Sequence, residues 1–214
     1  MGVEAEIIDN SIVLTYVLQH AAPLYGRTKL QKCMFLTELA LEKHRLTASH
    51  FRFYRYSYGP FSRDVWDSYD WLSERGFTTR PHLGLTERGS FLLSLIEELK
   101  KEPENQTIFE IVDSALKECR LRTGLDLLNY AYGLKVQPPN WDHAEEIARI
   151  PIGVDLIIPK SRNLKIPADL EWLISEELKL TAVQIQRGRE QWSKRERSAV
   201  ERLLKAIADS RELA

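Results

Sequence analysis

The sequence predicts a mainly helical protein with minor β structure: a winged-helix-like helical domain with a small β-hairpin and an added C-terminal helical pair. Three observations predict this class. Apolar residues recur at helical spacing through most of the chain, residues 49–58 alternate with period two, and two brief apolar segments between Gly76 and Thr86 flank a turn. Two helices, a strand pair and a further helix in this order are typical of a winged helix, whose wing would be this hairpin.

Composition limits the classes of protein that fit the sequence. The 214 residues are 43% hydrophobic, enough to fill a core, and the net charge is −1 with a pI near 6.5. The whole chain therefore lacks the positive field of an indiscriminate nucleic-acid binder. Cys33 and Cys119 lie in apolar helical segments without metal-ligand spacing. No apolar run approaches the ~20 residues of a membrane span, and we expect a cytoplasmic protein.

The first helix is expected over residues 11–20, because most of its circumference is apolar and Asn10 or Ser11 can serve as its N-cap. A second helix is expected from Thr28 to about residue 44. Thr28 and Gln31 have the spacing of a capping box. The apolar face of this second helix should bury Leu30, Cys33, Met34, Thr37 and Leu41.

Residues 49–58 alternate in the manner of an extended segment, which Gly59 and Pro60 should end. Pro60 suits the first turn of a new helix, although Ser62 is an alternative cap. Helical spacing of apolar residues then continues to a stop at Gly76.

The wing should consist of strands at residues 77–80 and 83–85. Thr86 is expected to cap the next helix, which ends before Pro103, and Gly89 would allow close contact between this helix and the strand. Further helices are expected over residues 108–121 and 123–134.

Domain boundaries follow from the remaining pattern. A short helix is expected at residues 141–149 and a strand within 152–159, and residues 160–167 have the composition of a linker. We divide the chain into a domain of residues 1–150, a connecting segment of 151–167 and a helical extension of 168–214. The extension should form helices at 168–178 and 182–213, which either cap the body or form a homodimer.

Several phrases of the sequence resemble the Panacea domain, the SocA-like antitoxin family, and within it the YwgA-like proteins. They are Thr28-Lys29-Leu30-Gln31-Lys32, the run from Phe53 to Ser62, Leu72 to Gly76, Leu85-Thr86-Glu87-Arg88-Gly89, and Leu127 to Tyr132. The resemblance covers roughly residues 1–150 and leaves the tail from Lys160 unmatched. It implies a protein-binding module that neutralises a toxin encoded nearby or hands clients to a protease, and it implies no cofactor.

The leading hypothesis is therefore a non-catalytic protein-interaction module, an antitoxin or a related binding factor. Lys29, Gln31 and Lys32 could form a polar, partly basic face that grips a partner protein, and Tyr56 and Tyr58 would complete it. The alternative interpretation of the three polar residues is a solvated first turn of a helix.

A winged-helix DNA-binding transcriptional regulator is the second hypothesis. Its phosphate contacts would come from arginines of the wing region and of the last helix, namely Arg63, Arg80, Arg88, Arg187, Arg189 and Arg195. Four carboxylates lie on the helix before the wing and would repel DNA: Asp64, Asp67, Asp70 and Glu74. A protein partner is therefore preferred.

Catalysis has little support in the sequence. The five histidines are scattered and fall in no metal-binding motif, and no phosphate-binding loop or nucleophile elbow is present. We expect neither a metal site nor a cofactor.

Overall fold

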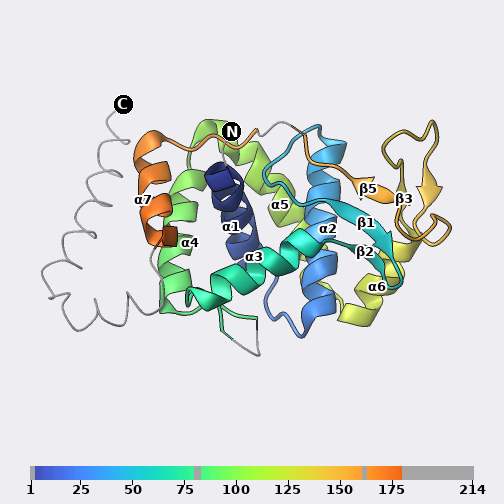
Figure 1. The fold of residues 1–214 in the computed structure, drawn as a ribbon, viewed down its shortest axis with the longest axis horizontal. Helices are drawn as coiled ribbons and strands as arrows, with labels where there is room; N and C mark the ends of the chain where they lie inside the picture. The colour runs from blue at the N-terminus through green and yellow to red at the C-terminus, as the bar shows by residue number, and fades with distance from the viewer. Residues whose placement is uncertain (1–2, 80–82, 161–162, 180–214) are drawn as a thin grey trace, which may run out of the picture.

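The computed structural model describes residues 3–79, 83–160 and 163–179, which form a mainly helical protein with small antiparallel sheets (Figure 1). The helices are α1 Val3–His20, α2 Arg27–Lys43, α3 Arg63–Glu74, α4 Glu87–Lys100, α5 Pro103–Leu121, α6 Gly124–Gly133 and α7 Ala168–Lys179. The strands are β1 Phe53–Tyr56, β2 Gly59–Phe61, β3 Lys135–Val136, β4 Glu145–Glu146 and β5 Asp155–Ile157. This confirms the expected fold class.

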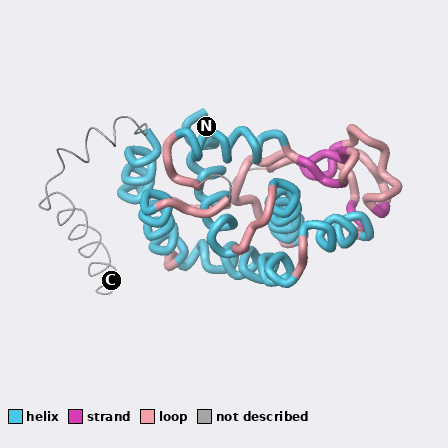
Figure 2. Tube along the Cα trace, turned by 90° about the horizontal axis from the view of Figure 1, so that it is seen from below, coloured by secondary structure: helices cyan, strands magenta, loops and turns pink. Residues whose placement is uncertain are grey.

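The strands gather at one end of the molecule, beside α6, while α4 and α7 lie at the other end (Figures 1 and 2). One sheet has the order β2-β1-β5 and the other pairs β3 with β4; all pairs are antiparallel. In the hairpin, Arg55 stands opposite Pro60 and Tyr56 opposite Gly59. The hairpin therefore places the side chains of β1 alternately toward the core and toward solvent.

The central helix is α2, which packs against α5 and α6 and is buried around most of its circumference. The predicted apolar face is confirmed, since Leu30, Cys33, Met34, Thr37 and Leu41 are all buried. The predicted capping box at Thr28 is wrong. The helix begins at Arg27 after Gly26, with no side-chain cap, and the Gln31 amide that would complete the box is bonded to Ser62 instead.

The first helix begins earlier than predicted, because α1 starts at Val3. Asn10 and Ser11 are therefore interior residues of this helix and not its N-cap. The Asn10 side chain accepts a hydrogen bond from the backbone amide of His50 at 2.7 Å, so it joins α1 to the chain before β1.

The break expected at Gly59 and Pro60 is in fact a tight hairpin. Gly59 has φ of +82°, a conformation that L side chains rarely adopt, and Pro60 lies within strand β2. Pro60 is thus not the first turn of α3. The alternative cap is confirmed, since the Ser62 side chain accepts from the backbone amide of Val65 at 3.4 Å.

The wing is reduced to a single bridge between Thr78 and Leu85 in the described residues around it. Thr86 caps α4 as predicted, with its hydroxyl accepting from the amide of Gly89 at 3.1 Å. Gly89 also allows the predicted close approach: a Cβ placed there would lie 2.1 Å from the carbonyl oxygen of Phe77.

The helix expected at residues 141–149 does not form. Its backbone is used by neighbouring segments: Ile147 and Ala148 donate to the carbonyls of Leu134 and Tyr132, and Glu145–Glu146 forms β4. The strand expected within 152–159 is confirmed as β5 Asp155–Ile157.

The end of the connecting segment lies along the helical body. Asn163 exchanges hydrogen bonds with Thr47, and Asn105 exchanges them with Lys165. The first predicted C-terminal helix is confirmed as α7, which packs on α4 and α1. The second, at residues 182–213, lies outside the described residues, so its part in capping or dimerisation stays a prediction.

Candidate protein-interaction surface

The three polar residues predicted to bind a partner point into the protein. Lys29, Gln31 and Lys32 have only 5%, 2% and 3% of their surface exposed. Each donates hydrogen bonds to backbone carbonyls of another segment of the chain. Neither a solvated first turn nor an outer basic face describes them, and a direct contact with a partner would require the segments above them to move.

Gln31 fastens the start of α3 to α2. Its Nε2 donates to the Ser62 carbonyl at 2.7 Å, and its Oε1 accepts from the Ser62 amide at 2.9 Å. A carboxamide can satisfy a backbone donor and acceptor at once in this way. The pair fixes where the hairpin ends and where the helix begins.

Lys32 fixes the hairpin to α2, as Gln31 fixes the start of α3. Its Nζ donates to the carbonyls of Tyr58 and Pro60 at 2.6 and 2.7 Å. Burial, and then the positive charge of Arg55, lower the pKa of Lys32 from 10.5 to about 8. Lys32 therefore stabilises the hairpin by hydrogen bonding while its charge is poorly solvated.

Lys29 joins a third segment to the same helix. Its Nζ donates to the carbonyl of Pro23 at 3.1 Å, in the loop before α2. A Cβ placed on Gly124 would meet the Cβ and amide nitrogen of Lys29 at 3.8 Å, so the start of α6 lies directly against it. The loop before α2, the hairpin and α6 thus meet around the first turns of α2.

Four large apolar side chains are exposed on these converging segments. Tyr58 is 71% exposed and Tyr56 is 46% exposed, as a partner-binding role requires. Tyr25, in the loop before α2, and Leu125, on the first turn of α6, are 76% and 66% exposed. We call Tyr25, Tyr56, Tyr58 and Leu125 the hairpin–α6 surface.

Sequence reasoning missed Tyr25 and Leu125. Each lies next to a glycine at the edge of a helix, where apolar spacing alone does not distinguish an exposed residue from a buried one. The available signal was their position, since both lie where a helix begins and burial is least expected.

The structure describes two arginines of the DNA-binding alternative, one of them buried and one exposed. Arg88 is 7% exposed, its Nε donates to Glu177 of α7 at 2.6 Å, and its guanidinium lies 3.9 Å from the centre of the Phe77 ring. Arg63 is exposed and lies 3.6 Å from Asp67. The remaining four, Arg80, Arg187, Arg189 and Arg195, lie outside the described residues.

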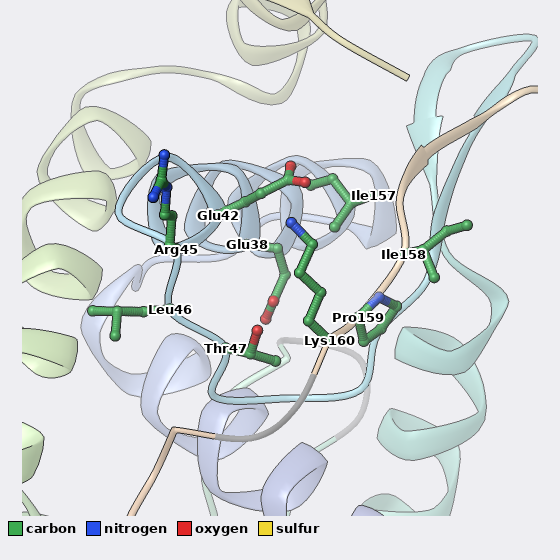
Figure 3. A pocket seen from close by; sticks show the side chains of 9 residues that line it. All are labelled: Glu38, Glu42, Arg45, Leu46, Thr47, Ile157, Ile158, Pro159 and Lys160. Atoms are coloured by element: carbon green, nitrogen blue, oxygen red, sulfur yellow. The ribbon is translucent and has the colours of Figure 1, made fainter. Parts of the chain in front are cut away.

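A small pocket, with Glu38, Glu42 and Lys160 among the residues that line it, lies between the C-terminal half of α2 and the chain that follows β5 (Figure 3). Burial raises the pKa of Glu38 to about 7, although Ser49 donates a hydrogen bond to it at 2.5 Å. Burial also raises the pKa of Glu42, while Lys160 opposes this effect.

Neither a metal centre nor a membrane span is found in residues 3–79, 83–160 and 163–179. In those ranges no three His, Cys, Asp or Glu side chains are grouped as metal ligands. No helix there has both the length and the apolar character needed to cross a bilayer. Cys33 and Cys119 are free and buried.

The chain was compared with protein-family models, with curated proteins and with solved structures, and nothing matches it.

Proposed function

We propose that this protein is a non-catalytic interaction module of the Panacea type, an antitoxin or related binding factor that occludes a partner protein in the cytoplasm. The observation that carries the proposal is the exposure of Tyr25 and Tyr58 on segments held by buried lysines, with the exposed Leu125 at the start of α6, which packs against Lys29. Tyrosine is enriched among residues that dominate protein interfaces. A surface already ordered in the free protein loses less conformational entropy on binding.

The rigidity of the hairpin supports this role for Tyr58. Lys32 bonds the carbonyl of Tyr58 itself, and the hydroxyl of Tyr132 donates to the adjacent Ser57 carbonyl at 2.6 Å. The tip of the hairpin is therefore tied to both α2 and α6. An exposed aromatic ring on a backbone tied at two points is suited to enter a pocket on another protein.

The DNA-binding alternative receives less support from the described residues. Arg88 is already occupied by Glu177, and Arg63 lies within ion-pair distance of Asp67 on the same helix. A regulator would need phosphate contacts from residues beyond these.

Co-expression with an adjacent gene tests the proposed function. The product of that gene alone should arrest growth, and the wild-type chain should restore growth. Tyr58→Ser and Leu125→Ser together should lose the rescue while the protein remains folded by circular dichroism.

Trp172→Ser is the matched control, because Trp172 is 60% exposed on α7, at the end of the molecule away from the hairpin and α6 (Figure 1). The control should rescue fully. An inert neighbouring product, or rescue by the double variant equal to that by the wild type, would count against the proposal.

A further inference from the structure

Glu38 is a buried carboxylate outside the hairpin–α6 surface. It lies in the C-terminal half of α2, is only 4% exposed and accepts a hydrogen bond from the Ser49 hydroxyl at 2.5 Å. It lines the small pocket between α2 and the chain that follows β5, together with Thr47 and residues 157–160 (Figure 3). We call residues 157–160 the strap. Glu38 therefore faces a small internal space that has the strap as its other wall.

The strap is fastened near its two ends. At its start, Ile157 is buried and pairs with Phe53 of β1. After it, the Asn163 amide donates to the Thr47 carbonyl at 2.8 Å, and the Thr47 amide donates to the Asn163 side chain at 2.8 Å. Between these fastenings Ile158 is 40% exposed, so solvent reaches the outer side of the strap. Release of the strap would therefore admit water to the pocket while the helices around it stay folded.

A negative charge on Glu38 is poorly compensated in the closed pocket. Burial raises the pKa of Glu38 to about 7, the Ser49 hydrogen bond opposes this effect, and the negative charge of Glu42 adds to it. Ionised Glu38 is therefore more stable in water than behind the strap. The other charged groups on the surrounding segments are Arg45 and Lys160, which line the pocket, and the pair of His50 and Asp9 beside Ser49.

We propose that the strap is a pH-sensitive cover, closed over a protonated Glu38 and released when this carboxyl group ionises. This cover is independent of the proposed function. Release places the carboxylate in water, where its pKa returns toward the ordinary 4.5. Between pH 4.5 and 7 the released state binds fewer protons than the closed state, so the equilibrium constant for release should rise by up to about tenfold per pH unit. Above pH 7 both states are ionised, and the constant should level off.

Hydrogen exchange of single backbone amides, followed by NMR in the full-length chain, tests this cover. The amides of Thr47 and Asn163 report on release of the strap, and that of Met34, in the buried middle of α2, reports on global unfolding. Each exchange rate is divided by the rate of an unstructured peptide at the same pH, which gives a protection factor. The factors of Thr47 and Asn163 should be lower than that of Met34 and should fall about 50-fold between pH 5 and 7.5.

Three variants assign the fall to Glu38. Glu38→Gln removes the titrating group and should make both protection factors independent of pH. Ser49→Ala removes the hydrogen bond that lowers the pKa of Glu38, so the factors should level off at a higher pH than in the wild type. This second variant decides if Glu38→Gln does not fold. Glu110→Gln, at an exposed glutamate of α5, is the control and should match the wild type.

Wild-type protection factors of Thr47 and Asn163 that do not change with pH would overturn the proposal. The same fall in Glu38→Gln, or an unshifted profile in Ser49→Ala, would also overturn it, because another group such as His50 would then be responsible. Protection factors equal to that of Met34 would overturn it as well, since the strap would then open only when the whole protein unfolds.

Discussion

Gln31 and Ser62 exchange two hydrogen bonds, from Nε2 to the Ser62 carbonyl at 2.7 Å and from the Ser62 amide to Oε1 at 2.9 Å. This pairing places a polar side chain of the central helix against the one backbone position where β2 ends and α3 begins. All four atoms are buried, so the pair has no competition from water. The polar residues around Gln31 therefore determine where the hairpin is held against α2. They also fix the position of the exposed Tyr58, which lies in this hairpin.

Replacing Gln31 tests this account of the fold. Gln31→Ala leaves a buried donor and a buried acceptor of Ser62 without partners, and each such group costs about 1–3 kcal/mol. The free energy of unfolding, measured in urea, should fall by about 2–6 kcal/mol. Gln137→Ala is the control, because Gln137 is exposed and its Nε2 bonds the Trp141 carbonyl. Equal stabilities of the two variants would contradict the role of Gln31.

Lys32 should give the stability a distinctive dependence on alkaline pH. Its pKa is about 8 in the folded chain and near 10.5 when unfolded, so between these values the unfolded state binds more protons. The contribution of Lys32 to the free energy of unfolding should therefore rise as pH increases from about 8 to 10.5, by roughly 3 kcal/mol.

The measurement compares urea unfolding of the wild type and of Lys32→Met across this window. The variant should be less stable overall, because it loses two hydrogen bonds. Its free energy of unfolding should not rise between pH 8 and 10.5. A parallel pH dependence in the two proteins would show that Lys32 is not the group responsible.

Glu38 should have the opposite effect in the acidic range. Its folded pKa of about 7 lies above the usual 4.5, so the folded state binds more protons between these values. The contribution of Glu38 to the free energy of unfolding is fully present below pH 4.5 and is lost as pH rises through 7. Glu38→Gln keeps an oxygen that can accept from Ser49 and should remove this slope, giving a more stable protein above pH 7. If the free energy of unfolding of Glu38→Gln fell more steeply with pH than that of the wild type, this explanation would be excluded.

Gly89 provides a test of the contact between α4 and the strand before it. In Gly89→Ala the new methyl group would lie 2.1 Å from the Phe77 carbonyl oxygen, so the helix must shift and stability should fall by several kcal/mol. Gly133→Ala is the matched control in α6, where a Cβ would meet nothing within 4 Å. The control should be neutral or more stable by up to about 1 kcal/mol. Thermal unfolding of both variants gives the comparison.

Much of the fold follows from local pattern in the sequence. The apolar face of α2, the Thr86 cap and the close approach at Gly89 depend on residues near one another in the chain, and each was predicted. The wrong predictions arise where a side chain finds its hydrogen-bond partner far away in the sequence. The Gln31 amide has the spacing of a capping box but bonds Ser62, 31 residues away.

The candidate surface was predictable only in part, for the same reason. Tyr56 and Tyr58 are exposed as a binding role requires, whereas Lys29 and Lys32 turn inward because backbone carbonyls of the loop and hairpin offer them hydrogen bonds. Those carbonyls become available only when the hairpin folds onto α2. No periodicity in the sequence carries that information.

The most direct test of the central claim is the affinity of the purified protein for its purified partner, measured by calorimetry with the wild type, Tyr58→Ser and Trp172→Ser. A hot-spot tyrosine contributes about 2 kcal/mol or more, so Tyr58→Ser should weaken binding about 30-fold or more, and Trp172→Ser should bind as the wild type does. Equal affinities for all three proteins would contradict the assignment of the hairpin–α6 surface as the interface.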